Sequence, residues 1–204
     1  MAKIIDFPLD GPNYRRARGK RPWVNPQQLD LFAHGKVVDL PTSLSPFELA
    51  LLYDEHDDPR AEQAYLRAIQ AGDNTADACC NIGALYADSG RPHEAYDYLG
   101  RAVVLDPQHM AAHLNLGSLY LGDNDLNLAA LHFERCCKLD PTNHSVYYHL
   151  GLVRARQGNL ADAIIALEQC RALAKRRNRT VDELLESLRQ ALRASAVNVA
   201  SDWC

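Results

Sequence analysis

The sequence lacks several features that would place it in a special class of protein. Its 204 residues contain no run of about 18 apolar residues, so no membrane-spanning helix is expected. The first residues carry one lysine and an apolar stretch too short for a signal-peptide core, so we expect a cytoplasmic protein. Neither sign of charge dominates, because 22 Lys and Arg stand against 26 Asp and Glu and give a net charge of −4. This balance argues against a nucleic-acid-binding surface that covers the whole protein.

Short motifs that identify common classes of enzyme are also absent from the sequence. It contains no GxGxxG, no Walker-type loop, no GxSxG and no HExxH. The eight histidines are scattered. His109 and His113 are four residues apart, but they lie across the boundary between two of the repeats described below, which makes a poor metal site. We therefore predict a protein that is not an enzyme and has neither a metal nor a cofactor.

The six cysteines do not suggest disulfides. Four of them form the vicinal pairs Cys79-Cys80 and Cys136-Cys137, and neighbouring side chains on a helix point about 100° apart. No CxxC occurs. We expect Cys79, Cys136 and Cys170 to act as small apolar side chains in a reducing compartment, and the last cysteine of the chain to be a surface thiol.

What the sequence does contain is a period of 34 residues. Three segments align without gaps, and each has Gly at its eighth position, Ala at its twentieth and Leu or Phe at its twenty-fourth. The segments are residues 76–109, 110–143 and 144–177. In each, two stretches of about a dozen residues carry apolar side chains at helical spacing on either side of a polar turn. The period therefore predicts an all-α fold of antiparallel helix pairs, in which the small residues let the two helices approach closely.

Two substitutions test this interpretation of the repeat. Gly117 is expected at a close contact between helices, so Gly117→Leu should overpack the array. Asn124 lies in a polar turn, so Asn124→Ala is expected to be nearly silent by comparison.

The pattern of small residues, large apolar residues and a closing proline resembles the tetratricopeptide repeat (TPR) family. The resemblance covers about 150 residues and implies a right-handed α-solenoid of helix-turn-helix repeats. The first helix of each repeat would line a concave groove for a peptide or partner segment. The resemblance therefore implies a non-catalytic adaptor or scaffold that binds another protein.

In the family the groove is set by fixed positions of each repeat, which here are mostly apolar or small. The candidate groove residues are Cys80, Ala84, Asp88, Leu114, Ser118, Leu121, Tyr148, Leu152 and Arg156. The basic residues with which some family members grip a carboxylate are missing, so the expected ligand is apolar and either extended or helical. Tyr148 and Leu114 are the expected anchors. The alternative is that the chain's own N-terminal segment covers part of this strip.

The repeats are flanked by a degenerate first unit and by a C-terminal helix. Residues 42–75 form the degenerate unit, and Ser45, Pro46 and Glu48 predict a capping box at its start. The whole repeat domain is residues 42–177. Residues 178–194 are expected to form a capping helix that opens on a second capping box at Thr180 and Glu183, and residues 195–204 a loose tail.

The N-terminal segment, residues 1–41, has a different composition. It holds five of the ten prolines and has a net charge of +3, against −7 for the rest of the chain. We expect it to be extended or flexible, because it is too short and polar to bury a core. Its basic run can contact nucleic acid, with Tyr14 and Trp23 available for stacking, or can simply be a solvated arm. The run consists of Arg15, Arg16, Arg18, Lys20 and Arg21.

The same segment contains the pentapeptide QLDLF, which is Gln28, Leu29, Asp30, Leu31 and Phe32. It resembles the peptide by which many bacterial replication and repair proteins dock on the sliding clamp. That resemblance implies the clamp as a partner, with the Gln at the pocket edge and the apolar side chains in subpockets. The alternative is that the apolar side chains pack on the first helix pair or in the groove of the same chain.

Two functions are consistent with these features. The leading one is an adaptor that presents a groove to a partner protein. The other is a DNA-associated accessory or regulatory factor, tethered to the clamp or to DNA through the basic run and QLDLF. The sequence identifies neither the partner nor the oligomeric state.

Overall fold

The computed structural model describes residues 44–174, 176 and 178–201. Every regular element within these ranges is an α-helix, so the predicted all-α fold is confirmed. The chain divides into two compact units between Ala112 and His113. Within the same ranges, no helix combines the length and the apolar character that crossing a bilayer requires.

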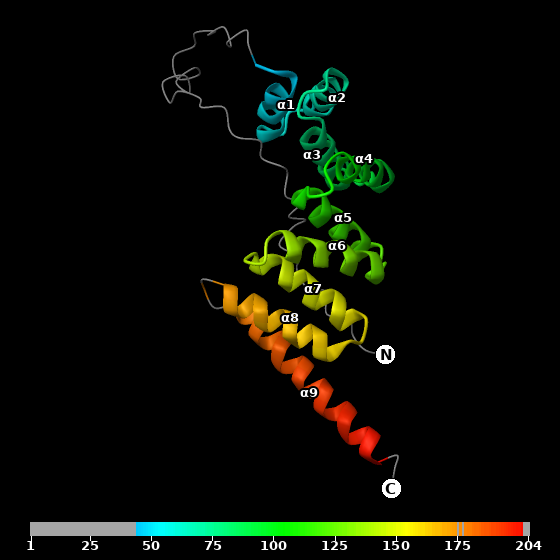
Figure 1. Ribbon diagram of the computed structural model, residues 1–204, viewed down its shortest axis with the longest axis vertical. Coiled ribbons are helices and arrows are strands. Elements are labelled where there is room, and N and C mark those ends of the chain that lie inside the picture. Colours follow the sequence, from blue (N-terminus) through cyan, green and yellow to red (C-terminus); the bar gives the residue numbers. More distant parts are fainter. Residues whose placement is uncertain (1–43, 175, 177, 202–204) are drawn as a thin grey trace. The chain divides into compact units, whose positions relative to one another are not determined.

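The first unit is built from antiparallel helix pairs (Figure 1). Helix α1 packs on α2 and α3 packs on α4, while α2 also contacts α3. Buried aromatic and carboxylate groups fix the first pair, where the hydroxyl of Tyr65 donates to Asp54 Oδ2 at 3.0 Å. The elements are α1 (Pro46–Glu55), α2 (Ala61–Ala71), α3 (Thr75–Asp88), α4 (Pro92–Leu105) and the first turn of α5 (Met110–Gly122).

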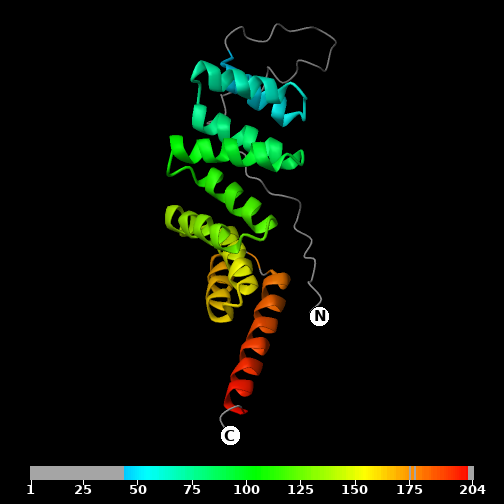
Figure 2. The same cartoon turned by 90° about the vertical axis from the view of Figure 1, so that its right-hand side faces the viewer.

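The second unit continues the same helix-turn-helix plan (Figure 2). Helix α7 packs on α6 and on α8, and α9 packs on α8. Beyond the remainder of α5, its elements are α6 (Leu126–Leu139), α7 (His144–Arg156), α8 (Leu160–Leu173) and α9 (Arg179–Ser201). Helices α4 and α6 end at Leu105 and Leu139, two residues before a proline, as the sequence predicts.

The repeated glycines lie where two helices of one repeat touch. A Cβ added to Gly117 would lie 2.9 Å from Cε1 of Phe133, and one added to Gly151 would lie 2.6 Å from Cγ of Leu167. A Cβ added to Gly83 would lie 2.7 Å from Cγ of Leu99. The eighth position of each repeat therefore contacts the twenty-fourth, and the requirement for a small residue is confirmed at all three glycines.

Capping residues begin several of these helices. Ser45 Oγ accepts from Glu48 N at 3.2 Å, and Ser45 N donates to Glu48 Oε2 at 2.9 Å, which confirms the predicted capping box of α1. Asp125 Oδ1 accepts from Leu128 N at the start of α6. The start of α9 differs from the prediction, because Asn178 Oδ1 accepts from Thr180 N at 3.0 Å and the helix begins at Arg179.

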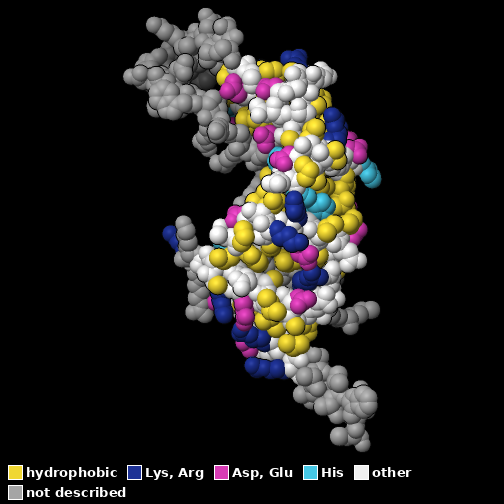
Figure 3. Space-filling model, viewed as in Figure 1, with side chains coloured by type: hydrophobic (Ala, Val, Ile, Leu, Met, Phe, Trp, Pro, Cys, Tyr) yellow, Lys and Arg dark blue, Asp and Glu magenta, His cyan; other side chains and the backbone are white. Residues whose placement is uncertain are grey.

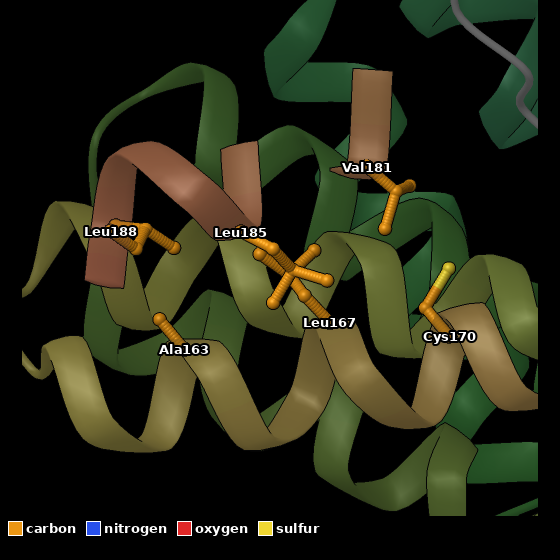
Figure 4. Packing of buried hydrophobic residues seen from close by; sticks show 6 residues of the cluster. All are labelled: Ala163, Leu167, Cys170, Val181, Leu185 and Leu188. Atoms are coloured by element: carbon orange, nitrogen blue, oxygen red, sulfur yellow. The ribbon is translucent and has the colours of Figure 1, made fainter. Parts of the chain in front are cut away.

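Helix α9 also runs further than the sequence predicted. It continues to Ser201 rather than ending at Ala194, because no Pro or Gly interrupts residues 179–201. Figure 4 shows its N-terminal half lying antiparallel on α8, with Val181 beside Cys170, Leu185 beside Leu167 and Leu188 beside Ala163. The last turns of α9 extend past the end of α8 in Figures 1 and 2.

The cysteines behave as the sequence predicts within the described residues. Cys79, Cys136 and Cys170 are buried and form no disulfide. Burial raises the pKa of the Cys136 thiol to about 12, so this thiol is protonated and unreactive at neutral pH. These side chains contribute to the core as small apolar groups.

Candidate functional site

The candidate groove residues of the second unit lie on α5 and α7. Three belong to each helix, and their spacing of three or four residues places each set on one helix face. We call this set the α5–α7 strip, and it consists of Leu114, Ser118, Leu121, Tyr148, Leu152 and Arg156. A hydrogen bond of 3.3 Å from Arg156 Nη1 to the carbonyl oxygen of Leu121 joins the ends of the two sets. The structure therefore brings the two halves of the strip together.

Burial varies along the α5–α7 strip. Leu114 and Leu121 are nearly buried, with 4% and 8% of their surface exposed, whereas Tyr148 and Leu152 are only partly buried. Arg156 is exposed at the end of α7. The side chains that remain accessible on this strip are thus Tyr148, Leu152, Arg156 and the partly buried Ser118.

Packing behind the strip holds Tyr148 in place. Its ring packs against the buried cluster that α8 and α9 share. The neighbouring His149 forms an edge contact with Tyr148, at 5.7 Å between centroids, and stacks on Phe133 at 5.3 Å. An anchor that is partly buried against a fixed wall loses little side-chain entropy when a ligand covers it.

Polar contacts at the end of the α5–α7 strip connect the C-terminal end of α7 to α6. Arg154 donates to Glu134 of α6 and, at 3.0 Å, to Gln157 Oε1. Gln157 Nε2 in turn donates to the carbonyl oxygen of Leu126 at 3.1 Å. Arg154, Gln157 and Leu126 line an open, polar hollow of about 720 Å³ between the α5–α6 and α7–α8 turns. Because they already bond to one another, we interpret the hollow as a structural junction.

Two histidines, one on α5 and one on α6, join these helices. Nδ1 of His113 lies 3.0 Å from Nδ1 of His132, and Tyr120 stacks on His132 at 5.5 Å between centroids. Burial, followed by the neighbouring His113, lowers the pKa of His132 to about 4. His132 is therefore neutral at physiological pH, and one of the two Nδ1 atoms donates to the other.

The candidate groove residues of the first unit are less accessible. Cys80 and Ala84 of α3 are fully buried, and only Asp88 at the end of that helix is exposed. Earlier on the same helix, Asp77 Oδ1 lies 3.0 Å from Nε2 of His109. The accessible apolar groups among the candidate groove residues therefore belong to the second unit.

Family models identify the repeats. Models of the tetratricopeptide repeat match residues 80–144 and 132–165. The repeats within residues 80–165 belong to the tetratricopeptide-repeat family. No curated protein matches the chain. The family assignment accounts for the position of the three glycines and for the helix pairs within the matched residues.

Solved tetratricopeptide-repeat structures show the same fold. A crystal structure of MamA is 27% identical and superposes with a TM-score of 0.56, covering 64% of this chain and 75% of MamA. The first TPR of Spaghetti (RPAP3) bound to the HSP90 peptide SRMEEVD is 22% identical, with a TM-score of 0.55 over 58% of this chain and 93% of that one. YrrB, described as a TPR protein with an unusual peptide-binding site, is 20% identical, with a TM-score of 0.58 over 70% of this chain and 73% of YrrB.

Two predicted sites lie outside the described residues. These are the QLDLF pentapeptide and the basic run Arg15–Arg21. On the face shown in Figure 3, described Lys and Arg side chains lie among Asp and Glu side chains. The described residues also contain no group of three or more His, Cys, Asp or Glu that could hold a metal ion.

Sequence reasoning missed how α9 packs. The 34-residue period places the start of a further first helix at residue 178, but α9 buries its fourth, eighth and eleventh positions, Val181, Leu185 and Leu188, against α8. Thr180 and Ser187 at its third and tenth positions are exposed, whereas Val146 and Val153 at those positions of α7 are buried. The groove positions of the family therefore do not carry over to α9 by counting.

Proposed function

We propose that the protein is a non-catalytic adaptor that binds a linear segment of a partner protein along the α5–α7 strip. The observation that carries this proposal is the placement of Tyr148 and Leu152, which are partly exposed on a strip whose remaining apolar members are nearly buried. Full burial of an exposed apolar side chain contributes about 1.5–3 kcal/mol. Tyr148 and Leu152 are already partly buried, so covering the rest of each supplies a fraction of that amount, and the other contacts of the peptide supply the remainder.

The chemistry of the strip sets the kind of ligand. Tyr148 and Leu152, together with Ser118 of α5, favour an apolar segment, and the guanidinium of Arg156 supplies donors at the end of the strip. Two structural neighbours with the same fold bind peptides: the RPAP3 domain is bound to an HSP90 peptide, and YrrB has an unusual peptide-binding site. These neighbours support peptide binding as the general activity. The contact residues that we propose come from the α5–α7 strip of this chain and not from the neighbours.

Selection of displayed peptides tests the proposal directly. The full chain is immobilised and offered a random peptide library, and the selected peptides are then synthesised and measured against two variants. Leu152→Glu places a charge on the strip and should weaken binding at least tenfold. Ile165→Glu is the matched control, because Ile165 is 59% exposed on α8 and lies outside the strip.

Two results would contradict the adaptor proposal. One is that the folded wild-type chain selects no peptide. The other is that Leu152→Glu and Ile165→Glu weaken binding equally, which would move the binding surface away from the α5–α7 strip. Helical circular dichroism of each variant establishes that it is folded before binding is measured.

A further inference from the structure

Helix α1, the first described helix of the chain, carries apolar residues on two opposite sides. Phe47, Ala50 and Asp54 form its buried side, and α1 packs on α2. At 100° per residue, Leu52 lies opposite these three residues, and Leu49 lies on the same side about one turn earlier. We call Leu49 and Leu52 the outer face of α1. Both side chains are only partly buried.

A first helix with an apolar outer face is unusual for a repeat array, because terminal repeats need a polar outward side. The last helix, α9, meets this requirement, since Thr180, Glu183, Ser187 and Gln190 are all exposed. On α1, the guanidinium of Arg60 covers another apolar residue, Tyr53, at 4.4 Å from the ring centroid. The two leucines therefore indicate a further contact that the α1–α2 pair does not itself supply.

The start of α1 shows from which side the preceding chain approaches. Ser45 is the N-cap of the helix, so Leu44 stands at the position before the cap and Leu49 at the fourth helical position. Apolar residues at these two positions form a hydrophobic staple, which fixes the angle at which the chain enters a helix. We therefore expect the segment before Leu44 to arrive along the outer face of α1.

That segment contains an apolar stretch of the right length. Residues 28–32, the QLDLF pentapeptide, place Leu29 and Leu31 on the same side of an extended chain. Five extended residues cover about 16 Å, and the ten residues of α1 are about 15 Å long. The twelve residues from 33 to 44 reach about 40 Å when extended, so the pentapeptide can fold back over the whole helix.

Charge favours this occupant over a second copy of the chain. Residues 44–112 hold 12 Asp and Glu against 4 Lys and Arg, a net charge of −8, whereas residues 1–41 carry +3. The N-terminal segment and the first unit therefore attract each other. Two first units that met through their outer faces would each carry the same negative charge and would repel.

We propose that residues 28–32 dock on the outer face of α1, with Leu29 and Leu31 against Leu49 and Leu52. A tethered ligand acts at an effective concentration near millimolar, so an intrinsic Kd of about 0.1 mM keeps the segment docked about nine-tenths of the time. Docking withholds QLDLF from any other partner. The contact lies within the first unit, so it does not depend on the α5–α7 strip.

Limited digestion of the full chain with chymotrypsin tests the docking. The protease cleaves after Phe32 only while the segment is undocked, so the cleavage rate reports the undocked fraction. A synthetic peptide of residues 24–40 gives the rate of the same bond without protection. We expect cleavage in the chain to be about tenfold slower than in the peptide, as measured by mass spectrometry of the products.

Variants on both sides of the contact locate it. Leu52→Ser should reduce the protection of the Phe32 bond to less than twofold. Val104→Ser is the matched control and should leave it unchanged, because Val104 is an aliphatic residue of the same unit that is 81% exposed on α4. Helical circular dichroism establishes that both variants are folded.

A second pair of variants changes no helix. Leu29→Ser with Leu31→Ser should abolish protection relative to a peptide of the same sequence. Val37→Ser with Val38→Ser is its control, because these residues are apolar and lie in the same segment but outside the pentapeptide. This pair should retain the protection.

Four outcomes would overturn the docking. The first is cleavage of the wild-type chain after Phe32 at the rate of the peptide. The second is an equal effect of Leu52→Ser and Val104→Ser. The third is loss of protection in the Val37 and Val38 variant but not in the Leu29 and Leu31 variant. The fourth is a wild-type dimer, detected by sedimentation, that Leu52→Ser dissociates, because the outer face would then contact a second copy. Peptide selection on the α5–α7 strip decides the adaptor function separately.

Discussion

Nε2 of His109 lies 3.0 Å from Oδ1 of Asp77, and the other ring nitrogen of His109 accepts from the backbone N–H of Ala112 at 3.2 Å. Because Nδ1 is an acceptor, the proton of the neutral ring is on Nε2, which donates to the carboxylate. His109 therefore begins α5 as a capping residue and links it to α3 within the first unit. The sequence presented the same histidine only as half of a poor metal site.

Replacing His109 tests this double role. His109→Ala removes the cap and should lower the free energy of unfolding by about 1 kcal/mol. His109→Asn should retain most of this free energy, because Asn143 is the residue directly before α7 and its side chain accepts from Ser145 N at 3.2 Å. Urea denaturation compares the variants. Equal losses for Ala and Asn would show that the bond to Asp77, and not the cap, is what matters.

The turn inside the second repeat depends on a left-handed residue. The fifteenth position of the three repeats has φ of 70° at Gly90, 61° at Asn124 and 81° at Gly158. Asn124→Ala should therefore cost about 1 kcal/mol, because a Cβ without a compensating polar group disfavours this conformation. This replaces the expectation from the sequence that the substitution is nearly silent. Asn124→Gly should cost nothing, and thermal unfolding of both variants decides the point.

Replacing a glycine inside a helix should change the stability in a direction that depends on the atoms around that glycine. Gly117→Leu should destabilise by about 1–3 kcal/mol or more, because even a Cβ at Gly117 would lie 2.9 Å from the fully buried Phe133 ring. Gly100 is also helical, but a Cβ there would meet nothing within 4 Å. Gly100→Ala should therefore stabilise by up to about 1 kcal/mol. Denaturant midpoints measure both, and a neutral Gly117→Leu would contradict the helix contact.

Acid should weaken the second unit through His132. Its pKa falls from 6.5 to about 4 on folding, mainly because of burial and then because of His113. Above pH 6.5 the ring is neutral in both states, so its contribution to stability is constant. Between pH 6.5 and 4 the unfolded chain takes up the proton first, so stability is lost, by up to about 3 kcal/mol.

A variant isolates this contribution from that of the carboxylates. His132→Phe keeps an aromatic ring beside Tyr120 but cannot be protonated. We expect the free energy of unfolding of this variant to fall less steeply than that of the wild type between pH 6.5 and 4. Parallel pH profiles for the two proteins would show that His132 does not carry the pKa shift.

Much of the fold could be read from the sequence because its determinants are local or periodic. The 34-residue period, the eighth-position glycines and the prolines after Leu105 and Leu139 fixed the helix pairs and their ends. The capping box of Ser45 and Glu48 was also readable, since its two groups are three residues apart. At the start of α9 the same reasoning chose Thr180, whereas Asn178 supplies the cap, because several side chains in one turn can accept the same bond.

The candidate site was readable only in part. Counting repeat positions found Tyr148 and Leu152, but it did not distinguish them from Cys80 and Ala84, which are fully buried. Exposure depends on which neighbouring helix covers a side chain, and the repeat pattern carries no such information.

The sequence by itself determined the repeat, the helix pairing and the places where a large side chain cannot fit, since each follows from spacing along the chain and from side-chain size. Only the tertiary structure decided that His109 caps α5 while bonding Asp77, that Asn124 is left-handed, and that His113 meets His132. These depend on residues far apart in sequence, or on a backbone conformation that the packing of two helices imposes. The candidate binding site also depends on the tertiary structure, because an apolar residue is available to a ligand only where the fold leaves it exposed.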